Sequence, residues 1–256
     1  MQKHWAWAFA PLVVIAILLV AAPQIALLAH RGGVFLAVLL LLAADLAIIG
    51  WLINNRPMGA FIDNRNCLSL SKLQAGAWTV VVLAAFATAA AFNANGADTT
   101  SVNALNVVIP GELLLAMGIS ATSLVAAPGL LSLKARETAA EGQDTQAAER
   151  LKTDIQANGK VLTKTAAQQA SLADLVTGDE IGNAGTPDLG KIQQALITLL
   201  LLGCYTDYVY VAFAKTAGLI TSLPVLDKSF VWLMGISHAS YLAYKAAPHT
   251  KSAESV

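Results

Sequence analysis

The sequence predicts an all-α integral membrane protein with six transmembrane helices, in which an N-terminal hairpin precedes two parallel hairpins that repeat one another. Three observations predict this fold. The 256 residues are 56% hydrophobic and 12% charged, with a mean hydropathy of +0.61, whereas soluble domains carry about 25% charged residues. The apolar runs are unbroken rather than alternating, which excludes a porin-type barrel. Short motifs also recur at a nearly constant separation, which indicates an internal repeat.

Six apolar runs reach the length of about 20 residues that a helix needs to cross a bilayer core. Turn-forming residues separate them, as in Asn54-Asn55-Arg56-Pro57 and Pro110-Gly111. The expected spans cover residues 5–28, 33–54, 74–93, 111–132, 192–214 and 229–247. They divide the chain into an N-terminal hairpin (1–56), a first repeat hairpin (57–132), a connecting segment (133–190), and a second repeat hairpin with the C-terminal tail (191–256).

The first span has a competing interpretation as a signal peptide. Lys3 precedes an apolar region with small residues at Ala21 and Ala22, as in a cleaved signal. The apolar run continues through Ile25 to Leu28, which is long for a signal peptide. A first transmembrane helix is therefore the favoured interpretation.

Basic residues in the connections predict the orientation, because positively charged loops stay in the cytoplasm. One side of the predicted topology carries thirteen Lys and Arg residues, including seven between the fourth and fifth spans, and the other side carries three. Both termini and the segment 133–190 are therefore expected in the cytoplasm. The two cysteines have no expected partner, which is typical of a protein facing a reducing compartment.

Two motifs occur twice in the second half of the expected bundle. Lys72-Leu73-Gln74 is matched by Lys191-Ile192-Gln193 at an offset of 119, and Met117-Gly118-Ile119-Ser120 by Met234-Gly235-Ile236-Ser237 at an offset of 117. An Ala- and Leu-rich background inflates such matches, but an identical tetrapeptide and a similar helix start at almost one separation predict a duplicated hairpin. Both copies run outward and back, so we expect a pseudo-two-fold axis along the membrane normal.

Each repeated motif has a structural interpretation. Ser71 and Gln74 have the spacing of a capping box, and Asp188 is expected to cap the other copy. Gly118 and Gly235 begin small-xxx-small faces, so we expect both at close helix crossings, with a functional role as the less favoured alternative. The helix-start residues are Ser71, Lys72, Gln74, Lys191 and Gln193, and the helix-packing residues are Gly118, Ser120, Gly235 and Ser237.

Several strings within residues 65–250 resemble a pattern in a known family. They are Ser69 to Gln74 leading to Trp78-Thr79, Leu172 to Leu175 with Gly182-Asn183, Asp188 to Lys191, and Gly235 to Leu242 with Lys245. In these strings the chain resembles an uncharacterised family of bacterial multi-spanning inner-membrane proteins with duplicated Lys-x-Gln…Gly-Ile-Ser hairpins. The resemblance implies one domain in a bacterial inner membrane and carries no activity.

Three ionisable residues lie inside the expected spans, where charge is costly and therefore marks a candidate functional site. At 1.5 Å per residue, Asp45 lies roughly 18 Å deep, while Asp207 and His238 lie roughly 10 and 13 Å below the outer surface. We therefore expect Asp207 and His238 within hydrogen-bond reach. Asp45, Asp207 and His238 form a candidate ion or proton site, although a buried pair that orders the helices is the favoured interpretation.

The connecting segment 133–190 is the largest part expected outside the membrane. Residues 137–158 are rich in Ala, Gln and Glu and place Leu151 and Ile155 on one helical face. We therefore expect a helix that lies on the membrane or against a partner and that Gly159 ends. The acids at 174, 179, 180 and 188 lack the spacing of a calcium loop and predict turns and helix caps.

No pattern in the sequence predicts catalysis, a metal or a cofactor. Nucleotide-binding loops, zinc-protease motifs and nucleophile elbows are absent, and the histidines at 4, 30, 238 and 249 have no metal-binding spacing. Cys67 and Cys204 belong to different depths, so neither a disulfide nor a zinc site is expected. The net charge of zero gives no reason to expect nucleic acid as a partner.

Three function classes remain, of which a membrane enzyme is the least favoured because it would need clustered nucleophiles or metal ligands that the sequence lacks. The favoured one is a non-enzymatic multi-pass membrane module, embedded in the lipid bilayer, that forms a homo-oligomer or docks as a subunit of a larger membrane complex. The alternative is an ion channel or proton-linked transporter that uses Asp207, His238 and Asp45.

Overall fold

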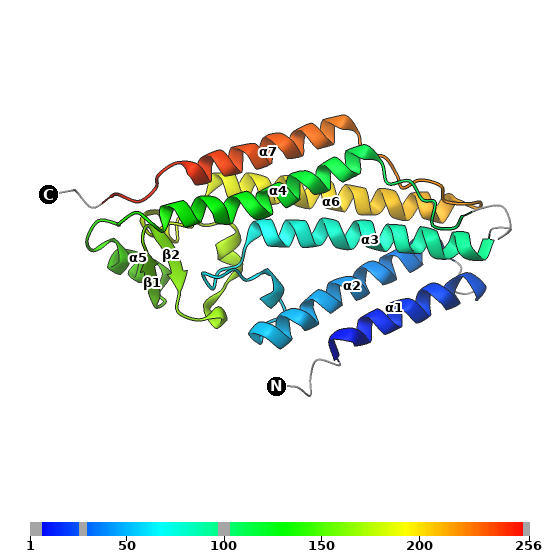
Figure 1. Ribbon diagram of the computed structural model, residues 1–256, viewed down its shortest axis with the longest axis horizontal. Helices are drawn as coiled ribbons and strands as arrows, with labels where there is room; N and C mark the ends of the chain where they lie inside the picture. The colour runs from blue at the N-terminus through cyan, green and yellow to red at the C-terminus, as the bar shows by residue number, and fades with distance from the viewer. Residues whose placement is uncertain (1–6, 26–29, 97–102, 253–256) are drawn as a thin grey trace.

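The computed structural model describes residues 7–25, 30–96 and 103–252. The described chain is mainly helical, with one small β-hairpin outside the bundle (Figure 1). Its α-helices are α1 (Ala10–Ala21), α2 (Arg31–Asn54), α3 (Leu70–Gly96), α4 (Gly111–Lys134), α5 (Gln143–Leu151), α6 (Leu189–Lys215) and α7 (Lys228–Ala246). The hairpin strands are β1 (Ile155–Asn158) and β2 (Val161–Lys164).

Five helical stretches of the described chain are long and apolar enough to cross a membrane. They are Trp7–Gln24, Arg31–Asn54, Leu70–Gly96, Gly111–Lys134 and Leu189–Lys215. The prediction of a helical, multi-pass membrane protein is thus supported, although α7 falls outside this set. Polar residues explain the difference, because α7 has a lysine at each end and His238 and several serines and tyrosines between them.

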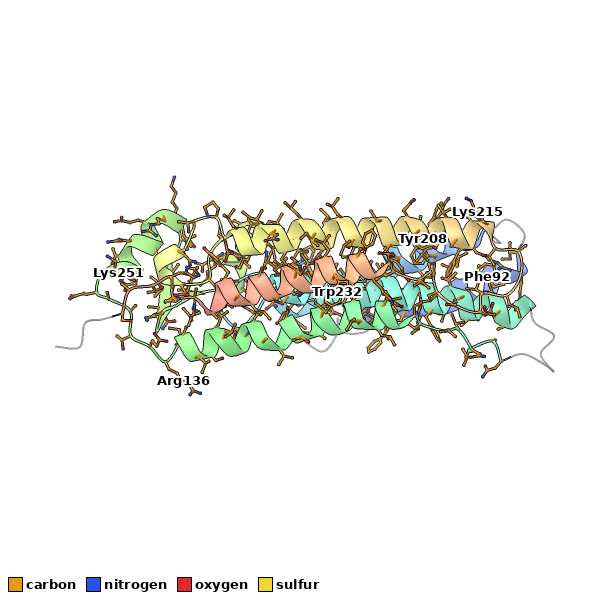
Figure 2. All side chains as sticks on the ribbon, turned by 90° about the horizontal axis from the view of Figure 1, so that it is seen from above. Phe92, Arg136, Tyr208, Lys215, Trp232 and Lys251 are labelled. Carbon is orange, nitrogen blue, oxygen red and sulfur yellow. The ribbon has the colours of Figure 1, made fainter. Side chains whose placement is uncertain are left out.

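Four helices surround the interior of the bundle in the order α3, α4, α7, α6 (Figures 1 and 2). The hairpin of α1 and α2 packs on the outside of this ring, with α2 against α3 and α6. The hairpins α3–α4 and α6–α7 run in the same direction, as expected for parallel repeats. A pseudo-two-fold axis along the bundle would set α3 diagonally across from α6, but these two are neighbours, so that axis is wrong. The duplication itself stays a prediction.

Extended connections shift α4 and α7 along the bundle relative to α3 and α6. The connections at 103–110 and 216–227 pair at Val108, whose N–H donates to the Thr221 carbonyl at 2.9 Å and whose carbonyl accepts from Leu223 at 2.9 Å. Asn93 near the end of α3 donates to the Ile220 carbonyl at 2.8 Å. Both connections therefore run beside the last turns of α3 and α6, which extend past the starts of α4 and α7 (Figure 1).

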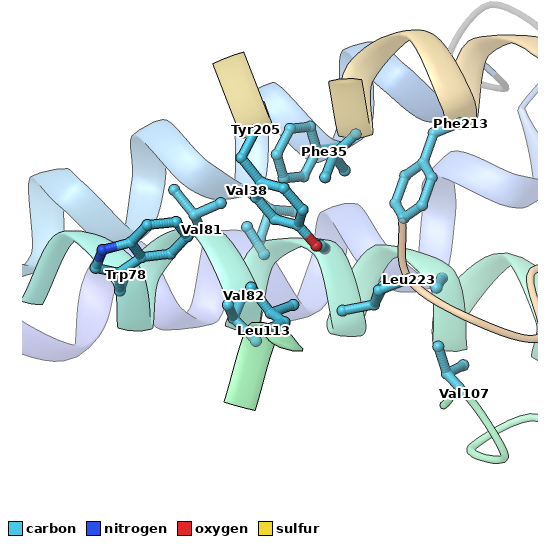
Figure 3. Close-up of a cluster of buried hydrophobic side chains, with 14 of the residues drawn as sticks. Phe35, Val38, Trp78, Val81, Val82, Val107, Leu113, Tyr205, Phe213 and Leu223 are labelled. Carbon is cyan, nitrogen blue, oxygen red and sulfur yellow. The ribbon is translucent and has the colours of Figure 1, made fainter. Parts of the chain in front are cut away.

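Aromatic and branched side chains fill the bundle between Trp78, near the start of α3, and these connections (Figure 3). Phe35 of α2 meets Phe213 of α6 edge-on at 5.9 Å between ring centroids, and Trp78 of α3 lies 6.1 Å from Tyr205 of α6. In a bilayer this packing holds helices together by close contact rather than by escape from water. Between Trp78 and the connections, the bundle is consequently closed by apolar side chains.

A close backbone approach fixes the end of α2 against the loop that follows it. A Cβ on Gly50 would lie 2.8 Å from the Gly59 nitrogen, and one on Gly59 would collide with the Gly50 carbonyl oxygen. Any other residue at either position would push the loop away from the helix. This loop, residues 57–69, leads directly into α3.

The connecting segment differs from the single helix expected over 137–158. Only α5 is helical there, and residues 155–164 form an antiparallel hairpin in which Asn158 pairs with Val161. Gly159 takes a positive φ of 58° in the two-residue turn, where it permits the reversal rather than ending a helix. The helical pattern was misleading here because Ile155, the one residue of β1 that is not exposed, packs on the same small core as Ala147 and Leu151.

Candidate functional site

The start of α3 brings Ser71 into the bundle instead of placing it at a helix cap. The helix begins at Leu70, and the Ser69 hydroxyl accepts from the Lys72 N–H at 3.4 Å. Ser71 is buried, and its hydroxyl lies 3.4 Å from that of Tyr241 on α7. Lys72 donates to the Ile62 carbonyl at 2.8 Å. The predicted capping box is wrong, because the capping serine is Ser69 and not Ser71. The sequence has a serine on each side of Leu70, and the prediction chose the second.

Gln74 forms the next layer of the interior, one turn further along α3. It donates from Nε2 to the Thr198 hydroxyl at 2.8 Å, and its Oε1 accepts from Gln194 at 2.7 Å. Gln193, the expected counterpart of Gln74, is exposed. The repeat alignment chose the wrong glutamine of the two, because consecutive helical residues differ by about 100° in direction. Asp188 caps α6 as predicted, accepting from the Lys191 N–H at 3.0 Å.

His238 joins this layer from α7. Its Nδ1 lies 2.6 Å from the Ser123 hydroxyl of α4 and 3.1 Å from Nε2 of Gln194. His238 is 3% exposed and Ser123 is fully buried. Gln74, Ser123, Gln194, Thr198 and His238, called the polar layer below, thus link all four helices of the ring.

The predicted pair of Asp207 and His238 does not form. Asp207 is exposed on α6, in an open hollow beside Leu36 and Tyr210. His238 instead contacts Gln194, which lies thirteen residues, or about 20 Å, earlier in the same helix as Asp207. The depth estimate assumed that α6 ends and α7 begins at the same membrane surface. The extended connection 216–227 instead runs back beside the last turns of α6, so α6 extends past the start of α7.

Asp45 does not join either residue. It lies on α2, outside the ring, and is 8% exposed, with one carboxylate oxygen that has no hydrogen-bond partner among the described residues. The three candidate residues of the ion or proton site are therefore at three separate places. Only His238 lies in the interior of the ring.

The repeated Gly-Ile-Ser motifs also differ from expectation. A Cβ on Gly118 would have no heavy atom within 4 Å, and one on Gly235 would meet only Cδ1 of Ile119 at 3.7 Å. The prediction of close helix crossings at both glycines is therefore wrong within this chain. The serines point inward, because Ser120 and Ser237 are buried, and neither hydroxyl has a hydrogen-bond partner in the described chain.

A buried ion cluster lies where α6 begins and α7 ends, and sequence reasoning missed it. The Asp179 carboxylate accepts from Arg65 at 2.9 Å, from Lys191 at 2.8 Å and from Lys245. Asp63 pairs with the same Arg65 at 2.7 Å. These five residues, the Asp179 cluster, come from the α2–α3 loop, the connecting segment, α6 and α7. They join the connecting segment to the bundle.

Further buried pairs strengthen this junction. Lys134 at the end of α4 binds Glu180, and Lys164 of β2 binds Asp174 at 2.5 Å. Asp174 also accepts from the Ser171 N–H at 2.9 Å, so its predicted role as a cap is confirmed. Asp179 and Glu180, expected in turns, are ion-paired. Segment 133–190 has nine acidic residues and six basic ones, and no local pattern among them pointed to these ion pairs.

The electrostatics of the cluster favour its charged form. Burial alone raises the pKa of Asp179, but Lys191, Lys245 and Arg65 outweigh burial and hold that pKa well below its ordinary value. Burial lowers the pKa of Arg65, but Asp179 and Asp63 reverse the effect and raise it. Burial raises the pKa of the nearby Cys67 thiol to about 11, which makes it a poor nucleophile.

One contact in the polar layer, the hydrogen bond between Ser123 and His238, resembles part of a catalytic site. A serine beside an imidazole is the minimal nucleophile and base pair of hydrolases. Both side chains are buried, however, and the imidazole's second partner is an amide rather than a carboxylate, so a substrate has no access to the pair. In the described chain no group of three His, Cys, Asp or Glu residues has the geometry to hold a metal.

Comparison with known proteins leaves the resemblance noted in the sequence untested. No family model, curated protein or solved structure matches this chain.

Proposed function

We propose that the chain spans a bacterial inner membrane six times, with α7 as the sixth span. Support comes from the position of α7, which lies along α4 and α6 in the same bundle (Figure 2). Its nineteen residues have a length of about 28 Å, close to the bilayer core. The basic bias of the connections then puts both termini and residues 133–190 in the cytoplasm.

We expect an impermeant thiol reagent on intact cells to label a cysteine at position 105 but not one at position 145. Leu105 and Thr145 are both exposed, and the proposal puts them on opposite sides of the membrane. Cys67 and Cys204 are replaced by serine beforehand, and both positions should react after the cells are permeabilised. Labelling of position 145 alone in intact cells would reverse the orientation.

For function, we propose a non-enzymatic membrane module that associates with a second copy, or with another membrane subunit, through the outer face of α4. The observation that carries this proposal is the small-residue stripe on that face. Gly118, Ala121, Thr122 and Gly129 lie along it, and Val125 between them is 76% exposed. Small side chains let a second helix approach closely, and the open space at Gly118 is unused within the chain.

Gly118→Leu is expected to weaken self-association in mild detergent by about tenfold or more, because the side chain would hold a partner helix away. Gly203→Leu on α6 is the matched control, since a Cβ at Gly203 would also have no heavy atom within 4 Å but lies on another face. Single-molecule subunit counting or cross-linking in vesicles measures the effect. If both variants lose self-association equally, or if the wild type is monomeric, two copies of the chain do not associate through α4.

A channel or proton-linked transporter remains the second candidate, because the polar layer buries an imidazole in the interior of the ring. It would use His238 without Asp207 or Asp45, which lie elsewhere. Proton flux into vesicles that is abolished by His238→Gln would favour this candidate over the first.

A further inference from the structure

An apolar hollow lies between the first turns of α4 and α7, on the outside of the ring. It has a volume of about 450 Å³, and its walls are mainly the apolar side chains of Leu115, Ile119, Val231 and Trp232. Trp232, seen on α7 in Figure 2, is 72% exposed. A hollow of this composition on a membrane-spanning surface faces hydrocarbon chains rather than water.

Two glycines keep the hollow open. A Cβ on Gly111 would have no heavy atom within 4 Å, and one on Gly235 would meet only Ile119 at an ordinary contact distance of 3.7 Å. A larger residue at Gly235 would therefore occupy the hollow without displacing the backbone. This space gives the repeated Gly-Ile-Ser motif of α7 a role other than the helix crossing expected from the sequence.

The mouth of the hollow carries one charge of each sign. Glu112 and Lys228 lie in the first turns of α4 and α7, and neither forms an ion pair within the part of the chain that the structure describes. The N-cap residue of α4 is Pro110, whose carbonyl accepts from Leu113 and Leu114 but which gives no side-chain cap, so the N–H groups of Gly111 and Glu112 are left for another acceptor.

The mouth lies about one bilayer core away from the opposite end of the bundle. Glu112 is 22 residues from Lys134 along α4, or about 33 Å, and Lys228 is 17 residues from Lys245 along α7, or about 26 Å. The hydrocarbon core is about 30 Å thick. If the buried residues Lys134 and Lys245 mark one membrane interface, Glu112 and Lys228 lie among the lipid head groups of the other membrane interface.

We propose that this hollow binds one phospholipid whose head group carries both a phosphate and a primary ammonium, as in phosphatidylethanolamine. The phosphate accepts from Lys228 and from the free N–H groups of α4, the ammonium donates to Glu112, and one acyl chain lies against Ile119 and Trp232. A choline head group has no N–H to donate to Glu112, and a glycerol head group has no positive charge. The inference rests on the membrane placement proposed above and not on self-association.

Native mass spectrometry of the full-length protein, delipidated and then titrated with single phospholipids, tests this site. We expect phosphatidylethanolamine to be retained about tenfold more than phosphatidylcholine or phosphatidylglycerol. Gly235→Leu should abolish that preference, while Gly203→Leu, also at an open helix position, should retain it. Glu112→Gln should remove the discrimination against phosphatidylglycerol, and Lys228→Gln should weaken binding of all three lipids.

Equal retention of the three lipids, or an unchanged preference in Gly235→Leu, would overturn the proposal. A circular dichroism spectrum equal to that of the wild type shows that each variant is folded. The same mass spectra report the ratio of monomer to dimer. Labelling at positions 105 and 145 tests the membrane placement separately, so absence of a lipid preference with the expected labelling is a failure of this site alone, and an unchanged dimer shows that self-association is not affected.

Discussion

Asp179→Asn is expected to destabilise the folded protein by about 3–5 kcal/mol, because Arg65, Lys191 and Lys245 would lose the carboxylate that they share. Removing one partner of a buried ion cluster leaves charge that cannot be solvated, and this cost exceeds the net contribution of the intact pairs. Thermal unfolding in mild detergent, followed by circular dichroism, measures the loss. We expect the connecting segment to become sensitive to proteolysis at the same time.

Asp154→Asn is the control for this substitution, because Asp154 is exposed in the same segment and forms no ion pair with a described residue. Its effect should stay within about 0.5 kcal/mol. Lys245→Met should be costly alone, whereas combining it with Asp179→Asn should cost less than the sum of the two. If Asp179→Asn lowers the free energy of unfolding by less than about 1 kcal/mol, water reaches and solvates the cluster.

The low pKa of Asp179 sets the pH at which its contribution disappears. In the unfolded chain an aspartate titrates near pH 4, and in the folded chain it titrates lower, so the stabilisation is fully present above about pH 5. It declines as the pH falls toward the folded pKa. The difference in melting temperature between wild type and Asp179→Asn should therefore be constant near neutral pH and shrink below about pH 4.

Gln194→Met is expected to cost about 1–3 kcal/mol for each buried group that it leaves unpaired. Gln194 donates to Gln74 and to His238, and methionine of similar size offers no donor to either. Gln193→Met is a matched control, since it makes the same change at the exposed neighbouring position and should be nearly neutral. Chemical unfolding in mixed micelles compares the two variants.

The double variant Gln74→Met/Gln194→Met should be less destabilised than the sum of the single variants, because it removes both halves of the amide pair. Additive losses would mean that the two glutamines act independently. A Gln193→Met variant as unstable as Gln194→Met would contradict the assignment of the buried glutamine.

The polar layer shows where sequence reasoning identified the right elements and the wrong partners. The repeat analysis selected Gln74 and the start of α6, and both lie in the interior, but it chose Gln193 over Gln194. It also selected His238 as a functional residue, yet its partners are Ser123 and Gln194. A linear pattern records spacing along a helix, whereas a partner depends on the rotation and axial position of two helices.

The Asp179 cluster was beyond prediction for a different reason. Its members are separated by more than 100 residues, from Arg65 to Asp179, and nothing local distinguishes Asp179 from an aspartate in a turn. The charge becomes buried only when the loop 57–69, the connecting segment and two helix ends meet. Long-range burial of this kind is a property of the assembled fold.

The sequence by itself determined the helical membrane class and the approximate positions of the long helices, because hydropathy and turn signals are local and add up along the chain. The tertiary structure decided which polar groups pair and which glycines stay open. The connection 216–227 lies along the bundle and sets α7 back, which joins His238 to Gln194 and leaves Asp207 outside. Relative axial position is decided by packing between distant segments, and no local pattern in the chain encodes it.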